Sequence, residues 1–313
     1  MSLPNYLSWT GCGSSCGEPP GMFTGATMHL FGLSASSGAM QALADKFLNP
    51  VTGISLEYKT LANSALLTFV DIERGTAATE AVGWLPGREC ALWIPLLETR
   101  FLALKTRPVM WCPYIFINYG IGMATGREVW GWSKALGDIE FPAPASAAPE
   151  FSLSTVIFRT FDATKPGGPE TLLKLTGDAP LDTSPDWATL GAATTALITQ
   201  LIGTVPAPLA FPIPGVFDFP AIALKQFRDS HTPHLACYQA IVDSPVRIRK
   251  FGGGGLHTAK FKLEVATCDS HPIVSKFLGK AVTAGSTVVD VDWGAWVKFD
   301  FDALPGSVIA KTT

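Results

Sequence analysis

Charged side chains are scarce in this sequence. They make up 16% of the 313 residues, against about 25% in an average globular protein. The 23 Lys and Arg residues are scattered among 26 Asp and Glu residues, so the chain lacks the basic stripe that neutralises phosphates in nucleic-acid binding proteins. A nucleic-acid partner is therefore not expected. Hydrophobic residues reach 47%, which predicts a large core or extensive subunit contacts.

Long apolar runs are missing as well. No segment approaches the ~18 uninterrupted apolar residues of a membrane-spanning helix, and the first residues lack a basic segment followed by an apolar stretch. We therefore expect a soluble, cytoplasmic protein with no membrane partner. Neither an internal repeat nor a shift in composition divides the chain, so we expect one domain over residues 1–313.

The cysteines form no pattern typical of a metal site or a disulfide scaffold. Cys12 and Cys16 are the only close pair, and no second Cys or His pair at zinc spacing accompanies them. Cys90, Cys112 and Cys237 lie in apolar sequence, which favours buried free thiols.

Other motifs that suggest ligand binding have simpler explanations. His231 and His234 have metal-like spacing, but Pro233 prevents the helix that would align both rings. The glycine run 252–255 is followed by neither a Lys-Ser or Lys-Thr pair nor a helix start, so we interpret it as a mobile hairpin turn rather than a phosphate loop. No Gly-x-Ser-x-Gly motif is present, which argues against a serine hydrolase.

Strand patterns are abundant. In the segment 257–267, apolar residues alternate with lysine and glutamate at period two, which is typical of a half-buried strand. The same alternation recurs in the segments 151–161, 171–176, 235–242, 246–251 and 297–302. A mainly antiparallel sheet is the simplest host for these segments.

Helix patterns are few. A Ser-Pro-Asp start at Ser184 predicts a packing helix that runs to about Ile202 and stops at Gly203. A second helix is predicted over 38–48, and a short third one after Pro272.

One lysine has unusual surroundings. The segment 126–137 reads Gly-Arg-Glu-Val-Trp-Gly-Trp-Ser-Lys-Ala-Leu-Gly and sets Lys134 beside Trp130 and Trp132. Burial among such residues disfavours an ammonium and leaves free amine at neutral pH. A free amine can attack a ketone. The alternative is an ordinary lysine that reaches the surface past aromatic neighbours.

This segment resembles the signature of the acetoacetate decarboxylase family, in which Gly-Arg-Glu precedes an aromatic residue, the Schiff-base lysine and Leu-Gly. Further similar features follow the same order over most of the chain from about residue 22. They are Met40-Gln-Ala-Leu, Glu89 six residues before Pro95, Leu224-Lys225 through Asp229, and Ser270-His271-Pro272-Ile273 with Leu278-Gly279.

The resemblance implies an α+β fold that is mainly antiparallel β, an acetoacetate decarboxylase-like β-barrel with a few packing helices. It also implies an N-terminal extension of about 20 residues, no metal or organic cofactor, and a homo-oligomer.

The resemblance also implies the site residues. Lys134 corresponds to the imine-forming lysine, whose type of activation is a known example of nucleophilic catalysis, and Glu89 to the active-site glutamate. Phe116 and Trp132 correspond to apolar pocket positions. Arg127 and Glu128 belong to the signature and either contact the substrate or brace the loop.

Three positions depart from the family pattern. Ala135 stands where the family has a second lysine, and the segment 24–29 lacks the expected arginine. A further family glutamate would fall near Val70, with Asp71 and Glu73 as imperfect substitutes. A substrate carboxylate would therefore lack its expected cation.

The sequence thus predicts a Schiff-base-forming, carbon-carbon lyase that decarboxylates a β-keto acid or related oxo-acid through an imine on Lys134. Glu89 would carry the proton transfers. Two alternatives stay open: an aldolase or dehydratase that uses the same imine on a ketone, and a non-catalytic barrel that binds apolar ligands.

Overall fold

The computed structural model describes Tyr6 and residues 16–79, 83–101, 103–143, 145–203 and 218–312. The helices are α1 (Ser37–Phe47), α2 (Asn49–Thr52), α3 (Gly120–Thr125) and α4 (Leu190–Ile202), with π-helical turns η1 (Gly126–Trp130) and η3 (Ile273–Phe277). The strands are β1 (Gly21–Ser34), β2 (Leu56–Thr60), β3 (Ser64–Ala77), β4 (Leu85–Arg100), β5 (Lys105–Ile117), β6 (Lys134–Leu136), β7 (Asp138–Glu140), β8 (Glu150–Ile157), β9 (Gly168–Gly177), β10 (Asp218–Phe219), β11 (Ala221–Arg228), β12 (Ala236–Asp243), β13 (Val246–Leu256), β14 (Phe261–Ala266), β15 (Ser286–Asp290), β16 (Trp293–Ala303) and β17 (Ser307–Lys311).

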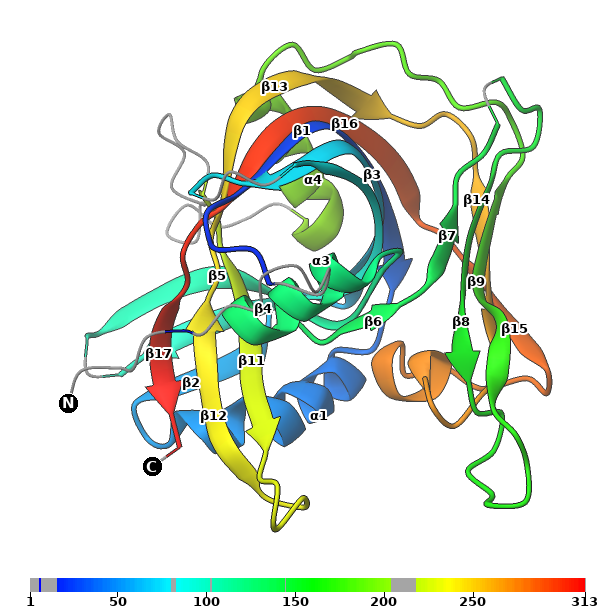
Figure 1. Ribbon diagram of the computed structural model, residues 1–313. Coiled ribbons are helices and arrows are strands. Elements are labelled where there is room, and N and C mark those ends of the chain that lie inside the picture. Colours follow the sequence, from blue (N-terminus) through cyan, green and yellow to red (C-terminus); the bar gives the residue numbers. More distant parts are fainter. Residues whose placement is uncertain are drawn as a thin grey trace.

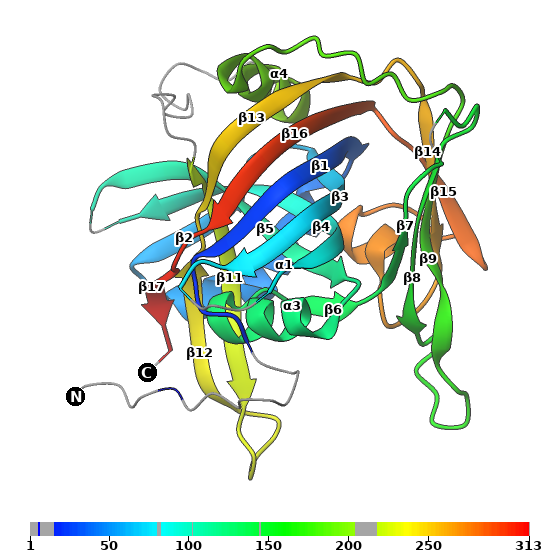
Figure 2. The same ribbon diagram turned by 45° about the horizontal axis from the view of Figure 1, so that its top comes forward.

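These strands form two sheets. The large sheet has the order β10-β13-β16-β1-β3-β4-β5-β11-β12-β17, with β2 paired to β4 and β6 paired to β5. It curls around α4 (Figure 1), while the small sheet, of order β15-β14-β9-β8-β7, stands beside it (Figure 2). Pairing is antiparallel except between β5 and its neighbours β11 and β6, so the prediction of a mainly antiparallel α+β fold is confirmed.

The predicted barrel is wrong in one respect, because neither sheet closes on itself within the described ranges. Closure requires every strand to have two neighbours. The end strands β10 and β17 each have one, β13 and β12 respectively. The large sheet is a deeply curved, open sheet.

Residues 29–33 of β1 and 65–70 of β3 are buried on both faces, which explains why these segments read as apolar runs and not as alternating patterns. Phe31 and Phe69 point toward the small sheet, where their ring centroids lie 5.4 and 5.2 Å from that of Phe151. Leu30 and Val70 point to the concave side. The main core therefore fills the space between the sheets, and the concave side is free to hold a site.

Each predicted strand segment contains a strand of the structure. In β14 the apolar side chains Phe261, Leu263 and Val265 are buried and the alternating charged ones are exposed. The strand begins at Phe261, later than predicted, because residues 257–260 form a bend between β13 and β14.

The helix predictions are confirmed for α1, which is capped by Ser36, and for η3. The prediction for α4 is wrong at its start, because Thr189 caps the helix and the first helical residue is Leu190. The Ser-Pro-Asp segment instead runs along β13, where the amides of Asp186 and Trp187 donate to the Gly254 carbonyl at 2.9 Å.

The glycine run 252–255 is accordingly no hairpin turn. It lies inside β13 and pairs with β16, and a Cβ on Gly254 would come within 2.6 Å of the Trp296 carbonyl oxygen. The glycines allow this close approach. Cys90 and Cys112 are buried as predicted, whereas Cys237 is exposed because it lies on the outer part of β12; Cys12 lies outside the described residues.

None of the described helices is long and apolar enough to span a membrane. The described His, Cys, Asp and Glu side chains do not gather in any group of three or more that could hold a metal ion.

Candidate active site

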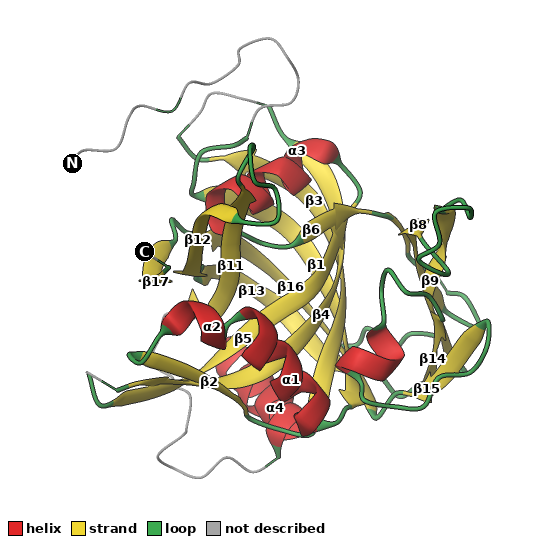
Figure 3. Cartoon of the chain, turned by 90° about the horizontal axis from the view of Figure 1, so that it is seen from below, coloured by secondary structure: helices red, strands yellow, loops and turns green. Residues whose placement is uncertain are grey.

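A cavity of about 1130 Å³ occupies the concave side of the large sheet. Its walls come from β1, β3, β4, β5, β13 and β16, together with α3 and α4, which lie at opposite ends of the sheet (Figure 3). Most of the lining side chains are apolar. The described lining residues with charged side chains are Glu18, Glu89, Lys105, Arg107 and Lys134.

Lys134 and Glu89 meet at the α3 end of this cavity. Strand β6 pairs in parallel with β5 and sets Lys134 opposite Ile115, while β4 sets Glu89 opposite Ile117. The ammonium of Lys134 contacts the Glu89 carboxylate directly. The two side chains are 13% and 20% exposed, so the pair is half-enclosed yet open to the cavity. The two residues that the resemblance singled out are brought together across 45 positions of sequence.

Glycines in the segment before Lys134 leave space for its aliphatic side chain and for the neighbouring strand β11. A Cβ on Gly126 would lie 2.6 Å from the Lys134 Cδ, and a Cβ on Gly131, whose φ is +84°, would lie 2.5 Å from the Lys225 Cα. Only glycine fits in both places, because a side chain would clash and the left-handed φ disfavours other residues. Arg127 donates through Nη1 to the Lys134 carbonyl at 3.1 Å. The signature turn η1 thus clamps the lysine backbone.

Tryptophans form the apolar wall beside this pair. Trp132 lines the cavity as predicted and meets Trp93 edge to face, with ring centroids 5.7 Å apart. The indole N–H of Trp93 donates to the Thr68 hydroxyl at 3.0 Å, and that of Trp130 to the Leu304 carbonyl at 2.8 Å. These bonds satisfy the polar edges of the rings, so apolar faces meet the cavity.

Phe116 does not line the cavity, contrary to the prediction. Side chains alternate along β5, so Ile115 and Ile117 face the cavity while Phe116 packs into the core between the sheets, 5.6 Å from the His271 ring centroid. Glu128 is also outside the cavity: it is exposed and accepts a hydrogen bond from the Tyr6 hydroxyl at 3.0 Å. Arg127 braces the loop and is likewise absent from the described lining.

The positions that depart from the family pattern leave the lysine without a cationic neighbour. Met28, from the segment that lacks arginine, lines the cavity and pairs in register with Val70. Asp71 lies on the outside, 3.4 Å from the Arg88 guanidinium. Ala135 packs against the core between the sheets. No second cation therefore stands at this end of the described cavity. The other charged lining residue there is Glu18, whose neighbour Gly17 donates through its amide to the Thr125 hydroxyl on α3.

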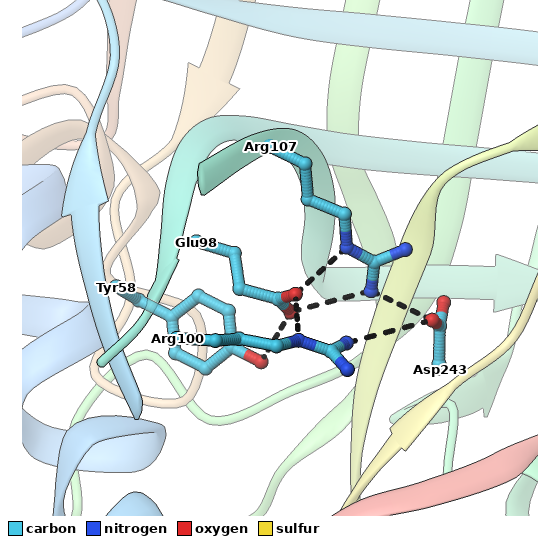
Figure 4. A network of polar contacts seen from close by, with 5 residues as sticks. All are labelled: Tyr58, Glu98, Arg100, Arg107 and Asp243. Carbon is cyan, nitrogen blue, oxygen red and sulfur yellow. Dashed lines mark hydrogen bonds and ion pairs between the residues drawn. The ribbon is translucent and has the colours of Figure 1, made fainter. Parts of the chain in front are cut away.

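Arg107, which lines the cavity far from Lys134, belongs to a separate ion cluster. We call this cluster the Glu98 network (Figure 4). Burial raises the pKa of the Glu98 carboxyl, but hydrogen bonds and charge from Arg107 and Arg100 outweigh it and hold this pKa below its ordinary value. Arg107 also donates to Asp243 at 2.6 Å, so its guanidinium is committed to protein partners. The network consists of Tyr58, Glu98, Arg100, Arg107 and Asp243.

Sequence reasoning missed two parts of the site. Tyr119 lines the cavity at the start of α3, and burial together with the nearby Glu89 charge raises its pKa to about 12. Helix α4 was predicted only to pack, yet Leu197 and Leu201 form part of the cavity wall. The sequence holds one weak signal for Tyr119, namely the glycines at positions 87 and 122. A Cβ at either position would come within 3 Å of the Tyr119 ring, so only glycine leaves room for it.

Comparison with known proteins bears on the fold. No family model and no curated protein matches the chain by sequence. Among solved structures, the acetoacetate decarboxylase of Legionella pneumophila superimposes with a TM-score of 0.64 at 14% identity, over 99% of this chain and 93% of that one. An acetoacetate decarboxylase-like enzyme from Sphingomonas wittichii gives 0.58 at 12% identity, over 99% and 100% of the two chains.

A third similar structure is MppR, an enduracididine biosynthesis enzyme solved with the condensation product of pyruvate and imidazole 4-carboxaldehyde. Its TM-score is 0.56 at 14% identity, over 93% of this chain and 90% of that one. At such identities the likeness establishes the fold. The chain therefore has the acetoacetate decarboxylase-like fold, in a sequence that has diverged far from these structures.

Proposed function

We propose that this protein is a Schiff-base-forming lyase that decarboxylates a β-keto acid or related oxo-acid through an imine on Lys134. The observation that carries the proposal is the contact between the Lys134 ammonium and the Glu89 carboxylate at one end of a largely apolar cavity. An amine with an adjacent proton acceptor, facing a cavity that is large enough for a ligand, has the parts that imine chemistry requires.

In the first half of the reaction, Glu89 takes a proton from the Lys134 ammonium and the free amine attacks the substrate carbonyl carbon. Glu89 then returns the proton to the departing hydroxyl, so that one water leaves and a protonated imine forms. The direct contact between the two groups makes both transfers possible without an intervening water.

In the second half, the bond between the α-carbon and the carboxylate breaks. Its electron pair moves into the protonated imine to give an enamine, and carbon dioxide leaves. Glu89, which has taken up a proton from solvent after the first half, supplies the proton that the enamine carbon takes up. Water then hydrolyses the imine, releasing a ketone and restoring the Lys134 amine. No redox partner is needed.

A second candidate is an aldolase or dehydratase that uses the same imine. It is favoured by the lack of a second cation near Lys134 among the described lining residues, since neither an aldol step nor a dehydration requires the substrate to carry a carboxylate. The structural likeness to MppR, which is solved with pyruvate and with a pyruvate condensation product, agrees with such chemistry.

Borohydride trapping tests the proposal. The protein is incubated with a panel of 2-oxo acids, 3-oxo acids and ketones, reduced, digested and mapped by mass spectrometry. We expect an adduct on Lys134 that disappears in Lys134→Met. Lys225→Met is the matched control, because burial lowers the pKa of Lys225 and makes it the rival amine. An adduct that persists in Lys134→Met and vanishes in Lys225→Met would overturn the assignment, and no adduct with any substrate would favour the non-catalytic binding protein.

We also propose that the whole chain acts as one domain, in a cytoplasmic homo-oligomer. The support for the oligomer is the end of β8 and the segment after it, where Val156, Phe158 and Phe161 are 54%, 43% and 70% exposed and the two phenylalanine ring centroids lie 6.3 Å apart. Exposed apolar side chains of this kind are typical of subunit contacts. Analytical ultracentrifugation is expected to show a species larger than the 33.3 kDa chain, and a monomer at micromolar concentration would contradict this part.

A further inference from the structure

The cavity extends far beyond the reacting lysine. Val70 pairs in register with Glu89, and six residues earlier on the same strand the Ser64 hydroxyl donates to the Leu201 carbonyl at the end of α4. At about 3.3 Å per residue along a strand, the two points are roughly 20 Å apart. Strand β6, which begins at Lys134, and helix α4 lie toward opposite ends of the large sheet (Figure 3). Lys134 therefore stands at one end of an elongated cavity and α4 forms the other end.

The walls between these two ends are apolar. The cationic side chains on the described lining, other than Lys134, are Lys105 and Arg107. They lie near the start of β5, eight or more residues from Ile115 and thus on the order of 25 Å along the strand. Arg107 is already bound by the Glu98 network. Apolar side chains that line the cavity away from Lys134 are Leu30, Leu66, Met110, Val297 and Phe299, and Leu197 of α4 lies at the far end.

The binding energy available to a substrate follows from these walls. A short oxo acid would contact only the end near Lys134, where Met28 occupies the segment that lacks an arginine, so its carboxylate would gain no ion pair with a second cation. It would also leave most of about 1130 Å³ of apolar space in contact with water. Typical small-molecule sites enclose roughly 300–1,000 Å³ and cover most of their ligand.

We infer that the substrate is an oxo-acid with a long apolar tail, whose carbonyl end reacts at Lys134 and whose tail extends along the concave face to α4. This inference rests on the proposed function and specifies its substrate class. Burial of the tail against Leu66 and Leu197 supplies the affinity that a carboxylate-binding arginine would otherwise supply.

A homologous series of 3-oxo acids from 3-oxobutanoate to 3-oxododecanoate tests the inference. Carbon dioxide release and the yield of the borohydride adduct on Lys134 are measured for each member. We expect kcat/KM to rise by up to about fourfold for each added methylene, until the tail reaches α4. A flat profile, or one that falls from 3-oxobutanoate onward, would overturn the long-tail substrate while leaving the Schiff-base function in place.

A variant on α4 localises the tail. Leu197→Trp fills the far end of the cavity and is expected to lower kcat/KM for 3-oxodecanoate at least tenfold, with 3-oxobutanoate unchanged. Thr195→Trp is the matched control, because it places the same side chain on the exposed face of the same helix. Should Leu197→Trp fail to fold, Ile198→Phe fills the same end. Equal loss for short and long substrates would contradict the assigned tail position.

Failure of the inference and failure of the proposed function are separable. Binding of long-chain methyl ketones to Lys134→Met, followed through tryptophan fluorescence, reports the apolar site without the imine. If this variant binds longer ketones more tightly but the wild type forms no adduct, the proposed function is wrong and the apolar site stands. If adducts form with equal yield at every chain length and Lys134→Met shows no preference, the tail inference is wrong.

Discussion

The Glu98 network and the pair formed by Lys134 and Glu89 are two ionic clusters of the described structure, and they are built differently. In the Glu98 network the carboxylate is completely buried and accepts hydrogen bonds from Arg100 at 2.7 Å, Arg107 at 2.7 Å and the Tyr58 hydroxyl at 3.0 Å. In the pair formed by Lys134 and Glu89, one ammonium meets one carboxylate at the cavity wall. The first carboxylate is saturated with partners and the second is not.

This difference separates a charge cluster that is saturated by protein partners from a pair that remains open to a ligand. The Glu98 network joins β2, β4, β5 and β12 (Figure 4), and a carboxylate with three donors has no capacity left for a substrate. The Lys134 amine and the Glu89 carboxylate each have capacity left, and both face a cavity. A charged group can act on a ligand only when it remains accessible, and of the two clusters the Lys134–Glu89 pair meets this condition.

Removing the acid of the open pair is expected to have the largest effect. In Glu89→Gln the amide cannot transfer protons, so turnover should fall about 10²–10⁴-fold, while a slow borohydride adduct on Lys134 still forms and the free energy of unfolding changes little. Steady-state kinetics and trapping are measured on the same preparation. Turnover within tenfold of the wild type would show that Glu89 does not carry the proton.

Removing the acid of the closed network is expected to act on stability instead. Glu98→Gln leaves Arg100 and Arg107 without their buried counter-charge, which should cost about 3–5 kcal/mol in the free energy of unfolding. Urea denaturation gives this value. Trapping at Lys134 in the folded variant should match the wild type; if trapping is lost while the fold persists, the network belongs to the site.

A buried pair without net charge offers a third test. His29 and His257 lie with Nδ1 and Nε2 3.1 Å apart in the core between the sheets. Burial, and for His29 also the proximity of His257, lowers their pKa values to about 3 and about 4. The unfolded chain takes up these protons near pH 6.5, so stability is full above that pH and falls as the pH drops toward 4.

At pH 5 we expect the histidines to cost roughly 2–4 kcal/mol of the stability present at pH 7. Urea denaturation of the wild type at both pH values is compared with the double variant His29→Leu, His257→Leu, in which carboxylate titration is retained. Equal losses in both proteins would show that the histidine pair does not cause the acid sensitivity.

The smallest expected effect is that of Tyr58→Phe. It removes one neutral donor from Glu98 and leaves both guanidinium groups, so the free energy of unfolding should fall by only about 1 kcal/mol. A loss as large as that of Glu98→Gln would mean that the hydroxyl and not the charge pairing holds the network together. Thermal and urea denaturation of the variant and the wild type measure this change in the free energy of unfolding.

Local pattern was enough to predict much of the fold, and it singled out Lys134, which lies on the cavity wall. The period-two alternation around Phe261 marked β14, because side chains of a strand point alternately to its two faces. The signature around Lys134 identified the lysine, and glycines 126 and 131 are where its stem and turn need them. Such features depend on neighbours in sequence.

Features that depend on distant contacts were decided by the tertiary structure. Phe116 lies in the core because side chains alternate along β5 and its neighbours Ile115 and Ile117 face the cavity. The segment before α4 pairs with β13 because the Trp187 amide donates to the Gly254 carbonyl. Whether a twelve-stranded sheet closes is set by its last strands. Local sequence does not reveal these pairings, because each depends on the register between segments far apart in the chain.

The sequence by itself singled out Lys134 and, through the family resemblance, Glu89 as its expected partner. It predicted activation by burial beside Trp130 and Trp132. Only the tertiary structure decided that the ammonium meets a carboxylate and opens onto a long apolar cavity. The physical reason is that a charge interacts with what lies within a few ångströms in space, and curvature of the sheet, not order along the chain, sets those neighbours.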